Sequence, residues 1–211
     1  MLKISEIKDV NHRNFKEAIM IYTKSFPPNE RQSIDIIKKR VKENLYQMFT
    51  GRLKDKVVFM ALLYPLKNTD FVLFDFMVVE KNYRNKGIGT KFVKNMLNLL
   101  RKKNVKKYLI LEVENPKYGN NKEQRKRRVE FYKRLGAKEM KNVRYLLPPL
   151  LGDFPTEMIL MVIPEYNDGV IQGGLVKTIV IQIYKELYGR NDNDSLLNSF
   201  IYDIDSTVKL E

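Results

Sequence analysis

The residues best suited to chemistry lie in a short stretch that leads from an apolar segment into a helix-forming one. It reads Phe76-Met-Val-Val-Glu-Lys-Asn-Tyr-Arg-Asn-Lys-Gly-Ile-Gly-Thr90. Gly87 and Gly89 have no Cβ, so the backbone there can approach a ligand closely. The first amides of a helix have no partner within it and can donate to phosphate oxygens, and Arg84 and Lys86 would add positive charge. The stretch predicts a phosphate-binding turn.

Two common phosphate-binding motifs do not fit this stretch. A dinucleotide-binding fold needs G-x-G-x-x-G, and Phe92 occupies the third glycine position. The Walker-type G-x-x-x-x-G-K-[ST] is missing from the chain. By themselves, the glycines are equally consistent with a tight strand-to-helix turn that binds nothing.

Composition narrows the chemistry that can accompany the turn. The 211 residues include no cysteine and a single histidine, His12, so we expect no disulfide, no cysteine nucleophile and no metal site. The formal net charge of +14 attracts polyanions such as nucleic acid, anionic lipid or a phosphorylated cofactor. Charge does not choose among them, and a solvated surface accounts for it equally well.

The chain shows no signal for a membrane. It has no run of about 18 apolar residues, the length that a spanning helix needs. Its first residues, Met1–Phe15, lack the apolar stretch of a signal peptide. We therefore expect a cytoplasmic protein without a membrane partner.

The pattern of apolar residues predicts a mixed α/β fold. Pro27 and Pro28 should end a first helix, Ser33 should cap a second, and Gly136 should end a charged one. In chain order we expect a strand at 2–7, helices at 15–26 and 33–45, strands at 46–52, 57–64 and 70–79, a helix at 87–102, a strand at 107–114, a helix from 120 or 121 to 135, and strands at 143–147 and 157–163.

The character of the chain changes after Pro164. Residues 168–174 resemble a linker, and apolar residues at helical spacing then predict helices at 175–187 and 195–202. We therefore divide the chain into a domain at residues 1–164 and a C-terminal helical extension at residues 165–211. The apolar stripe of the first tail helix needs burial, either on its own core or in a homodimer.

Two segments, in this order, resemble segments of a known enzyme family. Arg84-Asn-Lys-Gly87-Ile-Gly89 resembles the R/Q-x-x-G-x-G/A signature of the GNAT superfamily of acetyltransferases, with apolar Val79 before it. Val129-Glu-Phe-Tyr132-Lys-Arg-Leu-Gly136-Ala137 is similar to the family's FY-x-x-x-G-F segment, with Ala137 in place of the usual aromatic residue. The resemblance covers residues 1–164. It implies a mostly antiparallel, twisted sheet that splays between its fourth and fifth strands and is flanked by helices.

The resemblance also implies an N-acetyltransferase that passes an acetyl group from acetyl-CoA directly to an amine, in a small molecule or a peptide. Acetyl-CoA would be the only cosubstrate, without a metal, and would lie between the strands at 70–79 and 107–114. The strand backbone would pair with the pantetheine arm, and the turn would hold the pyrophosphate. The implied cofactor-binding residues are Met77, Val78, Val79, Arg84, Asn85, Lys86, Gly87, Ile88, Gly89 and Thr90.

Such a reaction needs an acid and a base. Tyr132 matches the family's tyrosine that donates to the coenzyme sulfur, although a buried tyrosine can simply pack. An amine with a pKa of about 10 must lose a proton before it attacks. Asp75 lies on the strand before the turn, and Glu112 and Glu114 share one face of the next strand. Each of the three is a candidate base, and each could instead bind a cationic acceptor or form an ion pair.

Two further features of the chain leave alternatives open. Arg125 and Arg128 replace the asparagine and alanine of many family members, and form either a solvated face or a contact with the 3′-phosphate or an anionic acceptor. Glu30 and Arg31 lie in the loop that covers the acceptor in this family, and are candidate substrate-binding residues unless the loop is only a helix break.

Two other functions compete with the acetyltransferase. A basic nucleic-acid-binding protein could use residues 122–128, but the chain contains no recognised nucleic-acid motif. A catalytically silent protein of the same fold could bind coenzyme A as a regulator.

Overall fold

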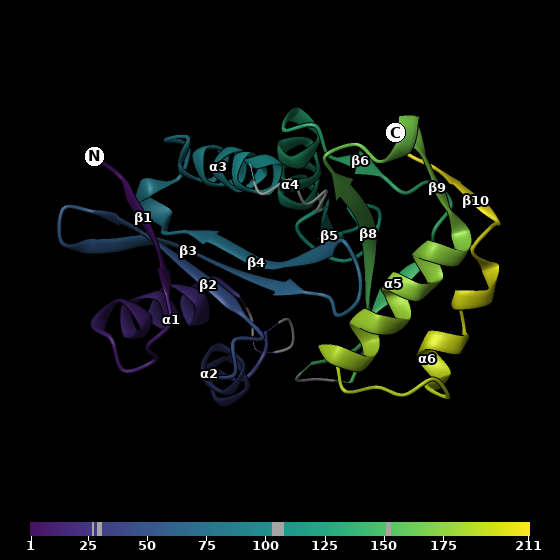
Figure 1. The fold of residues 1–211 in the computed structure, drawn as a ribbon, viewed down its shortest axis with the longest axis horizontal. Coiled ribbons are helices and arrows are strands. Elements are labelled where there is room, and N and C mark those ends of the chain that lie inside the picture. Colours follow the sequence, from purple (N-terminus) through teal and green to yellow (C-terminus); the bar gives the residue numbers. More distant parts are fainter. Residues whose placement is uncertain (27, 29–30, 103–107, 151–152) are drawn as a thin grey trace. The chain divides into compact units, whose positions relative to one another are not determined.

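The computed structural model describes all residues except 27, 29–30, 103–107 and 151–152, and has a mixed α/β fold (Figure 1). Within the described residues, the main sheet has the order β1-β2-β3-β4-β5-β8-β6, with β7 also paired to β8. The sheet is mostly antiparallel, and β4 and β5 run parallel. The fold class predicted from the sequence is therefore confirmed, whereas the splay between β4 and β5 stays a prediction.

The chain forms two compact units, and one of the boundaries between them along the sequence falls within strand β4. The described residues of the first unit lie in Met1–Pro65 and Phe74–Lys103, together with Leu150. Those of the second unit lie in Leu66–Leu73, Asn104–Pro149 and Asp153–Glu211. The division at residue 164 that we expect from the sequence stays a prediction.

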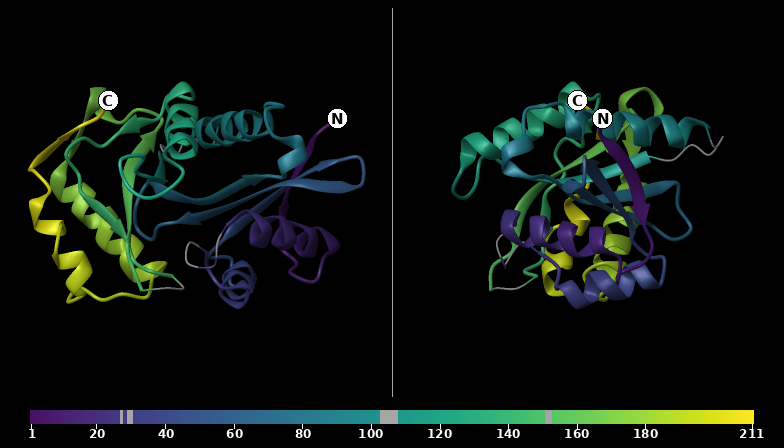
Figure 2. Two further views of the ribbon diagram at one scale, coloured as in Figure 1. Left: turned by 180° about the vertical axis from the view of Figure 1, so that it is seen from behind. Right: turned by 90° about the vertical axis from the view of Figure 1, so that its left-hand side faces the viewer.

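The first unit is a group of antiparallel strands with helices on both faces. Its strands are β1 (Lys3–Ile7), β2 (Gln47–Leu53), β3 (Lys56–Pro65) and the larger part of β4 (Phe71–Val79). Lys3 lies opposite Arg52, and Gln47 lies opposite Leu63. Helices α1 (Arg13–Ser25) and α2 (Ile34–Lys42) lie on one face, and α3 (Ile88–Lys102) lies on the other (Figures 1 and 2).

Local capping sets the ends of the first two helices. The imidazole of His12 accepts from Asn14 N at 3.1 Å, so His12 caps α1, a role that the sequence did not suggest. Helix α1 ends at Ser25, before the prolines, as predicted. The hydroxyl of Ser33 accepts from Ile36 N at 3.3 Å, which confirms Ser33 as the cap of α2.

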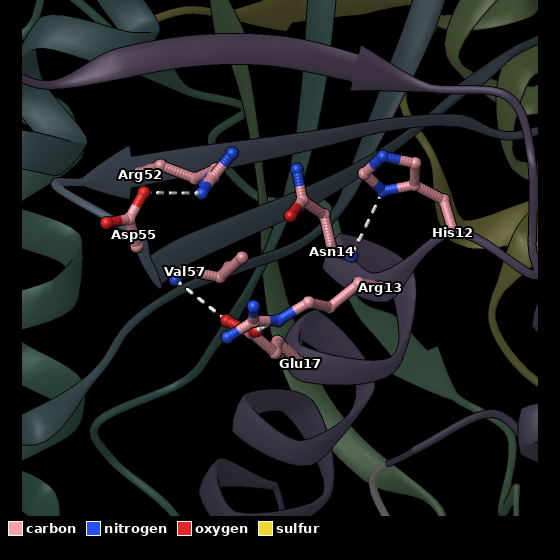
Figure 3. A network of polar contacts seen from close by, with 7 residues as sticks. All are labelled: His12, Arg13, Asn14, Glu17, Arg52, Asp55 and Val57. Atoms are coloured by element: carbon pink, nitrogen blue, oxygen red, sulfur yellow. Dashed lines mark hydrogen bonds and ion pairs between the residues drawn. The ribbon is translucent and has the colours of Figure 1, made fainter.

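A carboxylate anchors α1 to strand β3. Glu17 accepts from Val57 N at 3.0 Å and from Arg13 at 2.7 Å (Figure 3). The backbone hydrogen bond is the main reason that the pKa of Glu17 is lowered. Because 40 residues separate Glu17 from Val57, this contact depends on the tertiary fold.

Helix α3 packs on the strands through an aromatic cluster. The ring of Phe92 lies 4.8 Å from that of Phe59 and 5.9 Å from that of Phe74, centroid to centroid. The buried stripe runs through Phe92, Val93 and Met96, which places Leu97 inside it and Leu99 at its edge. The helical spacing of Leu99 from Phe92 and Met96 predicts an inward side chain, and this prediction is wrong, since Leu99 is 47% exposed.

The second unit is built around β5 and β8. Its main elements are β5 (Tyr108–Glu114), α4 (Lys122–Arg134), β6 (Lys138–Glu139), β7 (Tyr145–Leu147), β8 (Thr156–Ile163), β9 (Val170–Gln172), α5 (Gly173–Glu186), α6 (Ser195–Asn198) and β10 (Thr207–Lys209). Leu109 lies opposite Ile163, and Tyr108 N donates to Asp70 O at 2.8 Å, which joins β5 to the start of β4. Helix α5 lies on the other side of β8 from α4 (Figures 1 and 2).

The C-terminal helix α5 is packed within the second unit. An ideal Cβ at Gly173 would lie 1.7 Å from the carbonyl oxygen of Asp205, so only glycine fits there. The stripe of Val176, Ile179, Val180 and Ile183 is buried. The tail helix therefore buries its apolar face in its own chain, and the homodimer stays a prediction. Among the described helices, none has the length and apolar character that a membrane crossing requires.

Candidate active site

The turn after β4 has two left-handed backbone positions. After Val79 the chain makes a short 3₁₀ turn at Lys81–Tyr83, and the guanidinium of Arg84 donates to Val79 O at 3.1 Å. Asn85 has a φ of 60° and Gly87 a φ of 72°. Asparagine and glycine are the residues that adopt this conformation most easily. These two positions redirect the chain into α3.

The amides of the turn have no acceptor among the described residues, and the space beside Gly87 is open. The first hydrogen bond at the start of α3 runs from Lys91 N to Gly87 O at 2.9 Å. In the part of the chain that the structure describes, no group accepts from the amides of residues 85–90. A Cβ on Gly87 would meet no atom within 4 Å. The amides are therefore available to an anion at the positive end of the α3 dipole.

The side chains around these amides differ in exposure. Arg84, Asn85, Lys86 and Gly87 are exposed, Thr90 is half-buried, and Ile88 and Gly89 are buried. The ammonium of Lys86 lies 5.2 Å from the centroid of the Tyr83 ring. Along β4, Met77 and Val79 are half-buried while Val78 is buried, as a strand requires.

Asp75 lies on β4, four residues before the strand ends at Val79. It is half-buried, and Tyr46 donates a short hydrogen bond to its Oδ2. Desolvation raises the pKa of Asp75 to about 7, against the lowering effects of the Tyr46 hydrogen bond and the Arg40 charge. A carboxylate with this pKa can accept a proton near neutral pH.

Glu112 lies on β5 and is held by two hydroxyl groups. Tyr145 donates a short hydrogen bond to Oε1, and Tyr188 donates to Oε2 at 2.8 Å. Tyr145 is fully buried, and Tyr188 comes immediately after Leu187, the C-terminal cap of α5. Both carboxylate oxygens therefore already have a donor within the second unit.

Glu114 forms ion pairs with the two arginines that depart from the family pattern. Arg128 makes a short contact with Oε2, and the Nε of Arg125 lies 3.5 Å from Oε1. The side chains of Arg125 and Glu114 are only 13% and 12% exposed. Arg125 therefore belongs to a largely buried ion pair instead of a solvated face.

Tyr132 lies near the end of α4 and is 8% exposed. Desolvation raises the pKa of its hydroxyl to about 12, and the charge of Arg128 opposes this effect. At neutral pH the hydroxyl therefore keeps its proton and can act as a donor.

The loop between α1 and α2 contains the two candidate substrate-binding residues. Glu30 lies outside the described residues. The guanidinium of Arg31 donates to Thr23 O at 2.9 Å, so it stiffens the loop. Gln32, which the sequence analysis did not single out, is 5% exposed, and its Nε2 has no partner among the described residues. A polar residue in a loop looks solvated in sequence, so no local pattern could have identified it.

The structure thus divides the candidate residues between the units. The turn and Asp75 belong to the first unit, whereas Glu112, Glu114 and Tyr132 belong to the second. Tyr46 and Arg40 carry no local signal in the sequence, because their contacts with the Asp75 region depend on the tertiary fold.

Three solved structures with a similar fold are described as acetyltransferases. A GNAT-family protein from Bacteroides thetaiotaomicron has a TM-score of 0.74 at 20% identity, and the match covers 90% of this chain and 99% of that one. The ribosomal-protein-S18-alanine N-acetyltransferase of Escherichia coli has a TM-score of 0.57 at 21% identity, covering 78% and 94%. A GNAT acetyltransferase from Elizabethkingia anophelis with acetyl-CoA bound has a TM-score of 0.52 at 13% identity, covering 76% and 96%. At these identities the likeness shows the fold.

Comparison with individual curated proteins gives no significant match. Comparison with the sequence pattern of a whole family does give a match. The pattern described as the acetyltransferase (GNAT) family matches residues 14–137, which is more than half of the 211-residue chain and includes both the turn and Tyr132. The chain therefore belongs to the GNAT family and is an acyltransferase that uses acetyl-CoA.

Proposed function

We propose that the protein is an N-acetyltransferase that passes the acetyl group of acetyl-CoA directly to an amine in a small molecule or a peptide. The observation that carries the proposal is the turn after β4. Its amides at residues 85–90 have no acceptor among the described residues, and the space in front of Gly87 is open. Helix N-termini with free amides bind phosphate groups.

In this proposal the turn holds the pyrophosphate of acetyl-CoA. The main chain supplies the hydrogen bonds, while Arg84 and Lys86 are exposed cations at the same turn. The backbone of Met77–Val79, at the end of β4, pairs with the pantetheine arm. Main-chain pairing tolerates many side chains, which agrees with the apolar composition of this strand end.

Asp75 is the general base in this proposal. The two rival carboxylates are already engaged, Glu112 by two tyrosine hydroxyls and Glu114 by two arginines. Asp75 has a pKa raised to about 7, which suits proton transfer near neutral pH. It also lies on the strand that leads into the turn.

Tyr132 is the general acid. Its hydroxyl is protonated well above neutral pH because burial raises its pKa to about 12. The departing thiolate, with a pKa of about 8.5 for a cysteine-like thiol, is stabilised by such a donor. Glu30 and Arg31 remain candidate acceptor-binding residues.

The protons balance in this scheme. Asp75 takes one proton from the ammonium form of the acceptor, and the freed lone pair attacks the acetyl carbonyl. As the C–S bond of the tetrahedral intermediate breaks, the sulfur takes the proton of Tyr132. The amide nitrogen loses its second proton, which restores Tyr132 through solvent. Acetyl-CoA and the ammonium ion thus give the amide, free coenzyme A and one released proton.

Binding and turnover test the proposal separately. Acetyl-CoA should bind saturably in calorimetry, and a panel of amines should include one that releases the coenzyme A thiol. Among Asp75→Asn, Glu112→Gln and Glu114→Gln, only the first should abolish the acid limb of the pH profile of kcat/KM. A protein that binds no acyl-CoA contradicts the whole proposal. Loss of the limb in either glutamate variant contradicts only the assignment of the base.

A further inference from the structure

A chain of hydrogen bonds leads from helix α2 to the carboxylate of Asp75. The guanidinium of Arg40 donates to the hydroxyl oxygen of Tyr46 at 3.2 Å. That hydroxyl in turn donates to Oδ2 of Asp75. The three residues come from α2, from the residue before β2, and from β4, all within the first unit.

Aromatic packing holds Arg40 in place. Its guanidinium carbon lies 5.3 Å from the ring centroid of Tyr46 and 5.8 Å from that of Tyr64. The two rings are perpendicular, with their centroids 5.6 Å apart, and both tyrosines are 2% exposed. A planar guanidinium stacks and donates at once, which the ammonium of lysine cannot do in the same geometry.

The donor and acceptor properties of these groups fix the direction of the two hydrogen bonds, from Arg40 to Tyr46 and from Tyr46 to Asp75. A guanidinium has donors only, so Arg40 must occupy a lone pair of the Tyr46 oxygen. The single hydroxyl hydrogen of Tyr46 is then left for Asp75. Oδ2 of Asp75 is thereby capped. Oδ1 is the carboxylate oxygen that this series of hydrogen bonds leaves available to accept another proton.

We propose that Arg40 and Tyr46 are positioning residues for the reaction: they cap Oδ2 of Asp75 and direct Oδ1 toward the proton of the acceptor amine. The inference rests on the proposed role of Asp75 as base. It assigns a function to two residues that touch neither reactant and belong to a polar cluster inside the first unit.

The surroundings of Asp75 agree with this role. Among the described residues, the titratable and charged groups that face it include Tyr22 of α1, Arg40 of α2 and Tyr46. Burial raises the pKa of both tyrosines, and arginine stays charged, so these groups keep one protonation state at neutral pH. The Tyr46 hydrogen bond and the Arg40 charge both lower the pKa of Asp75, against desolvation.

The test uses Tyr46→Phe and Arg40→Met in the full chain. Carbon-13 NMR of aspartate carboxyl groups follows the titration of Asp75, with the resonance assigned by its loss in Asp75→Asn. The pH profile of kcat/KM follows the reaction in parallel. Both variants should raise the pKa at which Asp75 titrates. They should shift the acid limb of the kcat/KM profile to higher pH by the same amount. Below pH 7, kcat/KM should fall about tenfold, the ratio that one pKa unit implies, with little change at high pH.

Matched controls separate positioning from general damage. Lys39→Met removes the same charge from an exposed neighbour on α2, and Tyr202→Phe removes a hydroxyl from a side chain in a residue that is 77% exposed. Neither should move the limb. Arg40→Lys keeps the charge but loses the stacking, and should shift the limb partly. If Tyr46→Phe does not fold, the two Arg40 variants carry the test.

The outcomes distinguish this inference from the proposed function. An unchanged Asp75 titration in folded Tyr46→Phe and Arg40→Met overturns the positioning role and leaves Asp75 as the base. A titration that moves while the kinetic limb stays still shows that Asp75 is not the base, which overturns both. A protein that transfers no acetyl group to any amine defeats the proposed function itself.

Discussion

The hydroxyl of Tyr188 lies 2.8 Å from Oε2 of Glu112, although 76 residues separate them in the chain. Tyr188 comes just after helix α5, and Glu112 lies on β5. Together with Tyr145, it supplies a donor to each oxygen of that carboxylate. A tyrosine of the C-terminal segment therefore donates a hydrogen bond to Glu112, one of the candidate bases that the sequence indicates.

Tyr188→Phe should lower stability without changing the pH dependence of the reaction. Removing one donor from a half-buried carboxylate costs about 1–3 kcal/mol, which urea unfolding at pH 7 can measure. Tyr202→Phe, at a position 77% exposed, is the control and should have little effect. A shifted acid limb in Tyr188→Phe would instead make Glu112 the base.

The raised pKa of Asp75 makes the stability of the protein depend on pH. Its usual pKa is 3.8 and its pKa in the fold is about 7, so between these values the unfolded chain binds fewer protons. The contribution of Asp75 to the free energy of unfolding is largest below about pH 4 and is lost as the pH rises to about 7. The loss has an upper limit of about 4 kcal/mol, at about 1.4 kcal/mol per pKa unit.

The variant Asp75→Asn should lack this dependence and should be more stable than the wild type at pH 8. Chemical unfolding of both proteins at several pH values between 4 and 8 checks the prediction, since other groups cancel in the difference. A difference in unfolding free energy that stays constant across the range would show that the pKa of Asp75 is not raised.

Tyr132→Phe should reduce kcat by about a hundredfold, within the usual contribution of a general acid, and leave acetyl-CoA affinity nearly unchanged. The variant keeps the ring that packs at the end of α4 and removes only the hydroxyl. Calorimetry with acetyl-CoA and steady-state thiol release measure the two effects. Tyr118→Phe, at a position 52% exposed, is the control. Normal turnover in Tyr132→Phe would leave the residue a packing role only.

Gly87→Ala should weaken acetyl-CoA binding about tenfold. Gly87 has a φ of 72°, so alanine costs about 1–2 kcal/mol there and the turn is expected to relax away from the geometry that presents its amides. Gly189→Ala is the matched control, since its φ is 63° and a Cβ there also meets no atom within 4 Å. Equal affinity in the two variants, measured by calorimetry, would remove the turn from the binding site.

Gly173→Ala should destabilise the protein by about 3 kcal/mol, because the added carbon collides with the backbone of Asp205. Gly174→Ala tests the neighbouring position, where a Cβ meets no atom within 4 Å, and should stabilise helix α5 by about 0.5–1 kcal/mol. Urea unfolding of both variants compares them directly. Similar stabilities would mean that the contact between Gly173 and Asp205 does not form.

Local pattern was sufficient for the longer elements of the fold. The expected strand at 2–7 and helix at 87–102 correspond to β1 and α3, because side-chain periodicity within one element shows its buried face. The short strands β6, β9 and β10 were missed, since two or three residues carry no period. Their formation depends on partners elsewhere in the chain.

The same distinction applies to the candidate site. The sequence by itself determined the turn at Arg84–Thr90, because glycines and a helix start are local features, and it ranked Asp75, Glu112 and Glu114 equally. Only the tertiary structure decided which of these carboxylates already has partners. The tyrosine donors of Glu112 and the arginines of Glu114 lie outside the strand that carries these two carboxylates. The burial of each carboxylate likewise depends on the packing of other segments around it. A carboxylate's pKa and free lone pairs depend on those neighbours, and no spacing within a strand encodes them.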